Sequence, residues 1–378
     1  MDFELSEEQS LLKSTLAHYL AQQYDFAKRT AASRSEPGCR ADIWQGLASD
    51  LGLLGVAVPL DAGGLGGGAV EQMIVMEEAG RALLLEPLAE TLFQGGWLLQ
   101  KCGAAGLLPL IMSGSVRLAV AIGEPDMRFD YEDIAAAATR HGDGWRLCGH
   151  KAVVMAAPWA THFLIAARTS GARGDAHGIS LFLTTPEANG LTLHRYQTLD
   201  ERRAADMELK DVSVEAGALI GEEGEALALL EEMRDRAIAA QAAEATGLLD
   251  RLVRDTVDYA RQRKQFGQPI AAFQALQHRI VDMHMHVELA RSAAVLASLK
   301  LDAPATERAL ASSAAKVTIA KACRFVGQNS VQLHGGMGMT DDLPIGHYFK
   351  RATVIETEFG GEGWHLARHV RLSRQLPV

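Results

Sequence analysis

Two segments about sixty residues apart contain the side chains best suited to bind a phosphate-bearing ligand. Residues 263–270 read RKQFGQPI, and residues 331–338 read VQLHGGMG. Arg263 offers a planar guanidinium fork that matches phosphate oxygens. Gly335 and Gly336 let the backbone approach a ligand closely, and helix ends leave peptide groups unpaired. Together these features predict a site for a pyrophosphate-bearing ligand.

Long helices are expected to position both segments. From Glu225 onward the chain is rich in Ala, Leu and Arg, and its apolar spacing predicts helices over about 226–261, 273–299, 306–333 and 364–374. A Phe266-Gly267 break ends the first helix, and a new helix is expected to open at Ala271. The glycine cluster ends the third helix. Each segment therefore lies at a helix end.

The middle of the chain has the pattern of a β domain. Short apolar runs are separated by turn formers, and they occupy residues 118–122, 145–148, 163–167 and 179–183. This spacing predicts an antiparallel sheet. We expect it to follow a helical domain and to precede the long helices, with domains at 1–113, 114–222 and 223–378. The fold class is α+β.

The N-terminal part is predicted to be helical. Ser6 is followed three residues later by Gln9, which is a capping-box pattern, and further helices are expected near 43–51 and 70–84. Residues 63–68 between them are rich in glycine. A phosphate loop there would need a strand before it and a helix after it, so a flexible turn is the favoured interpretation.

Composition excludes several classes of function. The 378-residue chain has a formal charge of −10 and no Lys/Arg block, which argues against general nucleic-acid binding. Its four cysteines form no CxxC pair, and His284 and His286 point about 200° apart on a helix, so no metal site is expected. The acidic start and the interrupted apolar runs predict a cytoplasmic protein without a targeting peptide or membrane span.

At this spacing, the two motifs resemble the C-terminal half of the acyl-CoA dehydrogenases, flavoenzymes that desaturate acyl-CoA thioesters. Residues 44–90 resemble the N-terminal helical domain of the same family. The resemblance implies a C-terminal four-helix bundle, FAD as cofactor, an acyl-CoA substrate and an electron-transfer flavoprotein as electron acceptor. It also implies that one set of residues holds the FAD of a neighbouring subunit: Arg263, Gln265, Phe266, Gln274, Gln332, Gly335 and Gly336.

In this family a glutamate removes the α-proton of the thioester. By resemblance, its usual position is Phe359 here and its second position is Ala237, so neither family position holds a base. Two carboxylates remain as substitutes. Glu358 is adjacent to the first position, and Glu244 lies two helical turns after the second, in an apolar stretch that would raise its pKa. The alternatives are a surface Glu358 and a packed or ion-paired Glu244.

The family's contacts to the flavin ring are altered. Val153 stands where the family has Trp and Met155 where it has Thr, while Gly361 and Gly363 replace the Thr and Gln that follow the base. Contacts contributed across an interface are kept, and contacts to the chain's own flavin ring are lost. This pattern resembles the small subunit of heteromeric acyl-CoA dehydrogenases of the pimeloyl-CoA and steroid side-chain types, as do residues 334–342.

Three hypotheses stay open. The chain is the subunit without a base in a heterotetramer, or a self-sufficient flavoenzyme with a relocated base or altered reaction, or an acyl-CoA-binding scaffold without flavin. An assembly of two or four chains is expected, with a paralogous subunit or with further copies of this chain. The sequence does not predict the acyl group.

Overall fold

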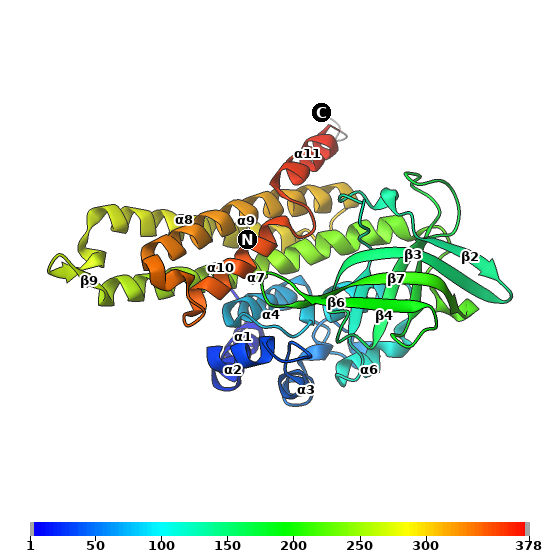
Figure 1. Cartoon of the computed structure of the whole chain (residues 1–378), viewed down its shortest axis with the longest axis horizontal. Coiled ribbons are helices and arrows are strands. Elements are labelled where there is room, and N and C mark those ends of the chain that lie inside the picture. The colour runs from blue at the N-terminus through cyan, green and yellow to red at the C-terminus, as the bar shows by residue number, and fades with distance from the viewer. Residues whose placement is uncertain (1–3, 375–378) are drawn as a thin grey trace. The chain divides into compact units, whose positions relative to one another are not determined.

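The computed structural model describes residues 4–374. They form two compact units. Unit 1 contains the residues up to Thr30, Gly68–Leu84 and the chain from Ile238 onward, and unit 2 contains Ala31–Gly67 and Leu85–Ala237. Each unit is described separately below, with the labels of Figure 1.

Unit 1 is built from helices and a short hairpin. Its N-terminal helices are α1 (Glu7–Gln23), most of α2 (Phe26–Ser33) and α4 (Ala69–Ala82). Its C-terminal helices are α7 (Ala226–Gln262, from Ile238), α8 (Gln274–Leu299), α9 (Ala305–His334), α10 (Pro344–Thr357) and α11 (Glu362–Ser373). Strands β9 (Lys264–Gln265) and β10 (Gln268–Pro269) form the hairpin that joins α7 to α8, at the left of Figure 1.

Local sequence explains where these helices begin and how they pack. The predicted capping box is confirmed: the Gln9 amide donates to Ser6 Oγ at 3.2 Å, and the Ser6 amide donates to Gln9 Oε1 at 3.0 Å. Helices α4 and α7 cross on two glycines. A Cβ on Gly80 would lie 2.0 Å from the Glu244 carbonyl oxygen, and a Cβ on Gly247 would lie 1.8 Å from that of Glu77. Only glycine permits this close approach.

One apolar core joins the C-terminal helices of unit 1. It takes side chains from α7, α8, α9 and α10, including Leu249, Leu252, Met283, Val287, Ile319, Val326, Tyr348 and Ile355. The paired residues on each helix are three, four or seven positions apart, which places them on one face of that helix. The packed helices therefore hold the α7–α8 hairpin and the end of α9 in fixed positions.

Unit 2 contains an eight-stranded sheet and short helices. The strands are β1 (Leu118–Ala121), β2 (Ala137–His141), β3 (Gly144–Met155), β4 (His162–Arg168), β5 (Ile179–Thr184), β6 (Leu191–Gln197), β7 (Arg203–Val214) and β8 (Leu219–Ile220). Their order is β6-β7-β3-β2-β4-β5-β8, with β1 beside β4. The helices include α3 (Ala41–Ser49), the π-helix Ala89–Gly96, α5 (Trp97–Lys101) and α6 (Leu108–Met112).

The structure corrects two details of the sequence analysis. The sheet is mixed rather than wholly antiparallel, because β1 and β4 pair in parallel, with Leu118 opposite His162. The β2–β3 hairpin lies between these two strands in the sequence, so the chain enters β4 in the same direction as β1. Helix α8 begins at Gln274 rather than at Ala271, because Ile270–Ala272 forms a 3₁₀ turn. Helix α10 was not predicted. Among residues 4–374, no helix combines the length and the apolar character that a membrane crossing requires.

Candidate functional site

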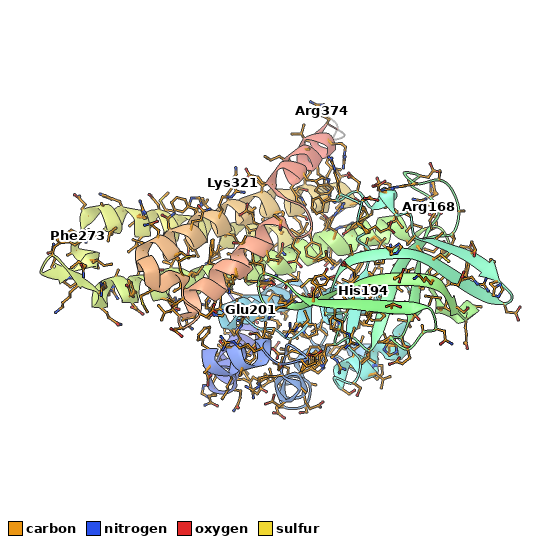
Figure 2. The ribbon with its side chains drawn as sticks, in the orientation of Figure 1. Arg168, His194, Glu201, Phe273, Lys321 and Arg374 are labelled. Carbon is orange, nitrogen blue, oxygen red and sulfur yellow. The ribbon has the colours of Figure 1, made fainter. Side chains whose placement is uncertain are left out.

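The hairpin between α7 and α8 presents the first motif to solvent. Phe266 and Gly267 have φ values of +54° and +80°, which produces the tight turn between the paired residues Gln265 and Gln268. Phe266 is 92% exposed, with only an edge contact to Phe273, 6.1 Å away between ring centres. Phe273 is labelled beside this hairpin in Figure 2. Because so large an aromatic surface is left uncovered, the hairpin is suited to contact another molecule.

The second motif forms an open glycine turn at the end of α9. Gly335 has φ +59° and ψ −141°, a conformation that side chains other than glycine rarely adopt. A Cβ at Gly335 or at Gly336 would meet no atom within 4 Å among the described residues. The packing of the chain itself therefore does not require glycine at position 336, whereas a ligand that approaches the backbone there would require it.

Tyr259 and His334 connect the two motifs. Their rings stack with centres 4.3 Å apart, and the Tyr259 hydroxyl donates to the His334 carbonyl at 3.3 Å. Tyr259 lies one helical turn before Arg263, and His334 directly precedes Gly335. His334 Nδ1 faces the Ser330 carbonyl oxygen at 2.8 Å, and burial lowers the pKa of this imidazole. The structure thus brings the two sequence motifs to the same end of unit 1.

The polar side chains of this half-site are not used within the chain. Among residues 4–374, the Arg263 guanidinium and the side-chain amides of Gln274 and Gln332 form no hydrogen bond or ion pair. Gln265 donates only to the neighbouring Lys264 carbonyl, at 2.8 Å. The guanidinium and the side-chain amides are hydrogen-bond donors to phosphate oxygens, and the open glycine backbone leaves space for the ligand. The residues present therefore fit the phosphate-bearing part of FAD.

In unit 2, the residues that by resemblance would face the chain's own flavin ring lack the polar and aromatic side chains that the family has there. Val153 sits at φ +53° in a bulge of β3, where its amide donates to Asp206 Oδ1 at 2.9 Å, and its side chain is 57% exposed. Met155 ends the same strand. Neither side chain provides a hydroxyl or an indole, so these two residues offer a flavin ring apolar atoms alone and do not make the ring contacts implied by the resemblance.

The first family position for the base is a strained turn in unit 1. Phe359 has φ +60° and Gly360 has φ +114°, directly after α10. The Phe359 carbonyl oxygen accepts a hydrogen bond from His365 Nε2 at 3.1 Å, and His365 is fully buried. The second position, Ala237, carries a methyl group. Neither side chain accepts a proton.

The two substitute carboxylates are partly exposed and belong to a charge network with the buried side chains of Arg351 and Lys316. Arg351 donates to both oxygens of Glu244, from Nε at 2.6 Å and from Nη2 at 2.8 Å, and to Glu358 Oε2 from Nη1 at 3.2 Å. Gln241 donates to the same Glu358 oxygen at 2.7 Å, and its own carbonyl accepts from Lys316 Nζ at 2.6 Å. Burial lowers the pKa of Lys316 to about 8, an effect that Glu358 partly offsets. Two carboxylates and two cationic groups therefore share one site.

This network decides between the interpretations of the two glutamates. Glu244 is ion-paired, as one interpretation held, and both of its oxygens are bound by a single guanidinium. The surface interpretation of Glu358 was wrong, because its side chain is 17% exposed and is bound by Arg351 and Gln241. Sequence reasoning missed Arg351 and Lys316. The one available signal was the seven-residue spacing from Arg351 to Glu358, which is two turns of a helix.

Comparison with known proteins finds similarity along nearly the full length of the chain. Family models for the N-terminal, middle and C-terminal domains of acyl-CoA dehydrogenase match residues 6–109, 119–212 and 230–370. Acyl-CoA dehydrogenase FadE12 of Mycobacterium tuberculosis is 31% identical over 353 residues, which cover 90% of this chain and 89% of that protein.

Two solved structures are similar over nearly their whole length. The Tcur3481–Tcur3483 steroid ACAD G363A variant is 30% identical with a TM-score of 0.88, and 98% of each chain is covered. The ChsE4–ChsE5 complex from Mycobacterium tuberculosis is 26% identical with a TM-score of 0.89, and 100% of each chain is covered.

Proposed function

This chain belongs to the acyl-CoA dehydrogenase family, and from that premise we propose that it is the subunit without a catalytic base in a hetero-oligomeric, FAD-dependent acyl-CoA dehydrogenase. The main support for this proposal is the following observation. The half-site around Arg263 and Gly336 is exposed, and the Arg263 guanidinium has no hydrogen bond or ion pair among residues 4–374, while Phe359 and Ala237 occupy both family positions for the base. Such a chain contributes to a cofactor site without supplying the proton acceptor.

The proposal assigns roles to the residues of the half-site. When bound, FAD supplies the acceptor for the hydride that leaves the β-carbon of the acyl thioester. Arg263 would bind the phosphate charge, Gln265, Gln274 and Gln332 would donate hydrogen bonds, and the backbone at Gly335 and Gly336 would admit the cofactor to close range. Phe266 would pack against the partner. The glutamate that removes the α-proton belongs to the partner chain.

An apolar row on α8 supports the association of this chain with others. Val281, Met285 and Leu289 follow one another at four-residue spacing and are each more than half exposed. Leu296 and Leu299 extend the row towards the end of the helix and are about half exposed. Side chains at i and i+4 lie on one face of a helix. Ser292 interrupts the row between Leu289 and Leu296. An exposed face with this many apolar side chains is typical of a protein–protein contact, which fits an assembly of two or four chains.

The similar structures support a heteromeric assembly. One is the ChsE4–ChsE5 complex, and the other is the Tcur3481–Tcur3483 steroid ACAD. We therefore propose a paralogous subunit as partner, an acyl-CoA of fatty-acid or steroid origin as substrate, an electron-transfer flavoprotein as acceptor and a cytoplasmic location. We also propose that the chain is divided into an N-terminal helical domain at 1–113, a β domain at 114–222 and a C-terminal helical domain at 223–378.

The experiment is to compare the purified chain with the chain co-expressed with its paralogue. We expect the isolated chain to hold FAD substoichiometrically, and the pair to bind it fully and to elute as a tetramer. A clean monomer with one FAD per chain, shown by light scattering and the flavin absorbance spectrum, would contradict the proposal. Absence of flavin from both samples would instead support the scaffold hypothesis.

A further inference from the structure

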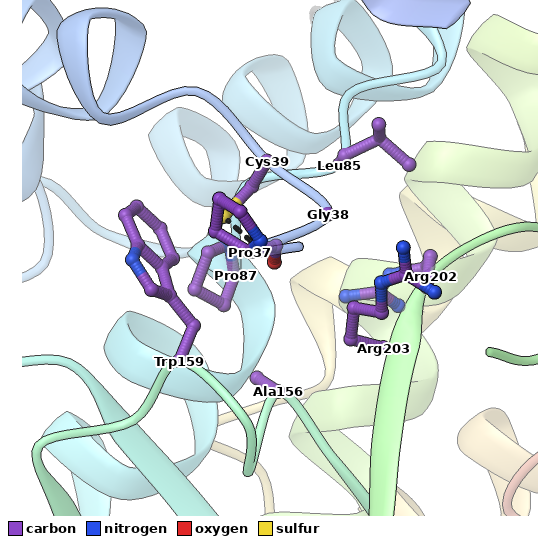
Figure 3. Close-up of a pocket in the computed structure, with 9 residues that line it drawn as sticks. All are labelled: Pro37, Gly38, Cys39, Leu85, Pro87, Ala156, Trp159, Arg202 and Arg203. Atoms are coloured by element: carbon purple, nitrogen blue, oxygen red, sulfur yellow. Dashed lines mark hydrogen bonds between the residues drawn. The ribbon is translucent and has the colours of Figure 1, made fainter. Parts of the chain in front are cut away.

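A hollow on the surface of unit 2 is lined by an unusual combination of side chains. Its volume is about 390 Å³, and its walls come from Glu36, Pro37, Pro158, Trp159, Arg195, Tyr196 and Arg203. A smaller cavity shares three of these residues, Pro37, Trp159 and Arg203. In Figure 3 the Trp159 and Pro37 rings lie on one side of this smaller cavity, and Arg202 and Arg203 lie on the other. The larger volume is in the range of small-molecule sites.

Two guanidinium groups at the hollow have no carboxylate partner. Among residues 4–374, neither Arg195 nor Arg203 forms an ion pair, whereas the adjacent Arg202 is paired with Glu90 at 2.5 Å. Arg203 donates through Nη2 to the Ser33 and Ser35 carbonyl oxygens, at 3.0 and 2.7 Å, and its buried Nε has no hydrogen-bond partner. Uncompensated positive charge in a concave surface favours an anionic ligand.

The Arg203 guanidinium is fixed in place before any ligand binds. The two carbonyl bonds come from the loop at residues 33–38, which wraps around its side chain. A Cβ on Gly38 would lie 2.4 Å from Arg203 Cγ, so that loop closes on the arginine because position 38 is glycine. A preorganised cation loses little conformational freedom when it binds an anion.

Trp159 supplies a rigid aromatic wall. The Arg117 guanidinium carbon lies 4.5 Å from its ring centre, and Trp44 meets it edge-on at 5.7 Å. Arg117 Nε also donates to the Trp159 carbonyl oxygen at 2.8 Å. Pro37 and Pro158 add flat apolar surface beside the indole. An indole held in this way is suited to stack on the planar ring of a ligand.

Glu36 is the one acidic side chain among the residues that line the hollow. A carboxylate here would not stabilise a simple anion, but it would accept hydrogen bonds from a ligand that also has hydroxyl or amino groups. The Tyr196 hydroxyl already donates to Asp206 at 2.8 Å, and burial together with Asp206 raises the pKa of Tyr196 to about 12, so this phenol stays neutral. The hollow therefore has three kinds of lining group: the cationic arginines, the aromatic ring of Trp159 and the hydrogen-bond acceptor Glu36.

We propose that this hollow binds an adenosine phosphate. The phosphate contacts Arg195 and Arg203, the purine packs on Trp159, and ribose hydroxyl or purine amino groups donate to Glu36. The ligand is either a free nucleotide or the nucleotide end of coenzyme A, since both present the same chemistry. The coenzyme A alternative rests on the function proposed above, whereas the free-nucleotide alternative does not.

Calorimetry on the full chain, with its partner where the assembly requires one, tests the proposal with ADP, inorganic phosphate, adenosine and coenzyme A. ADP should bind more tightly than phosphate or adenosine, because it engages both parts of the hollow. Arg195→Gln should weaken ADP binding by about tenfold or more, as expected for a lost charged hydrogen bond of about 1.5–3 kcal/mol. Arg195 is exposed, and its side chain forms no hydrogen bond or ion pair with the residues that the structure describes, so this variant is expected to fold.

Arg128→Gln is the matched control, because it removes one exposed arginine elsewhere in unit 2. Trp159→Phe provides a second test, since the smaller ring should weaken ADP and leave phosphate unchanged. Coenzyme A binding that also depends on Arg195 would identify its nucleotide end as the ligand; binding of ADP alone would identify the free nucleotide. The proposal is overturned by phosphate binding as tight as ADP, by no ADP binding at millimolar concentration, or by equal losses in Arg195→Gln and Arg128→Gln.

Discussion

Arg351 binds both carboxylate oxygens of Glu244, at 2.6 and 2.8 Å, in a site where the arginine side chain is 4% exposed. The same guanidinium also contacts Glu358. A general base needs a free lone pair directed at the proton that it removes. Arg351 binds both oxygens of Glu244 and the Oε2 atom of Glu358, so both candidate carboxylates are directed at a cation rather than at a substrate proton. The proposed division of roles between two subunits would account for both features, the absent base and the exposed half-site around Arg263.

Arg263→Ala should weaken FAD retention in the assembled enzyme by about tenfold or more. A charge-assisted contact to phosphate contributes about 1.5–3 kcal/mol. The measurement is flavin release followed by fluorescence during dialysis of the complex. Arg261→Ala is the control, since Arg261 is an exposed arginine two residues earlier with only a 3.8 Å surface contact to Asp258. Unchanged flavin affinity in Arg263→Ala would make Arg263 a structural residue.

Gly336→Ala should reduce FAD content without lowering the free energy of unfolding of the isolated chain. A Cβ at this position meets no atom within 4 Å in the part of the chain that the structure describes, so we expect the added methyl group to interfere with a bound ligand rather than with folding. Gly106→Ala has the same open surroundings and serves as the control. Thermal unfolding and flavin absorbance are measured on both variants. Full flavin content in Gly336→Ala, or an equal loss in both variants, contradicts the assignment.

Met285→Glu should shift the assembly towards smaller species. The substitution places a charge in the exposed apolar row of α8, where burial against a partner would leave it unpaired. Leu11→Glu, at a comparably exposed leucine of α1, is the control. Light scattering across a concentration series reports the mass of each variant. If both variants keep the wild-type mass, the α8 row is not an interface.

Stability should rise between about pH 8 and 10.5 because of Lys316. Burial lowers the pKa of this lysine from 10.5 to about 8, so the unfolded chain binds more protons than the folded chain in this window. The free energy of unfolding therefore increases with pH there, by roughly 2 kcal/mol between pH 7 and 9.5 at 1.36 kcal/mol per pKa unit. Lys316→Met should abolish that rise.

Lys321→Met is the control for this experiment. Lys321 lies on the same helix and is labelled in Figure 2, but its side chain is 53% exposed. Urea unfolding is measured for the three proteins at several pH values. Parallel curves for wild type and Lys316→Met would show that the lysine is not perturbed.

Much of the fold was predictable because its signals are local. The Ser6 capping box, the Phe266-Gly267 break and the glycine turn after His334 each depend on a few adjacent residues, and the structure has all three. Helix α10 was missed because residues 344–357 include Gly346 and several β-branched residues, which are poor helix formers. Its stability comes from buried contacts of Ile345 and Ile355, which local sequence does not show.

The charge network was unpredictable for a related reason. Glu244 and Arg351 are 107 residues apart, and only the packing of α7 against α10 brings them together. The sequence identified Glu244 and Glu358 as the carboxylates to examine, and the family positions at Phe359 and Ala237 as lacking a base. Apart from the seven-residue spacing of Arg351 and Glu358, it contained no local sign that the same arginine also binds Glu244. Helix propensity and spacing describe single elements, whereas this site exists only after they pack.

The central claim is that this chain provides no base for α-proton removal. It is tested most directly by anaerobic bleaching of the flavin with a panel of acyl-CoAs. We expect the isolated chain, reconstituted with FAD, to bleach negligibly, because general-base catalysis commonly contributes about 10²–10⁴-fold. Bleaching should appear on addition of a paralogous chain with a glutamate at either family position. Phe359→Glu alone should recover little, since Val153 and Met155 still replace the ring contacts.

In the same assay, Glu244→Gln and Glu358→Gln should leave bleaching by the complete assembly within about twofold of wild type, because neither carboxylate takes part in proton removal. Rapid bleaching by the isolated chain that is abolished by Glu244→Gln or by Glu358→Gln would contradict the account and establish a relocated base.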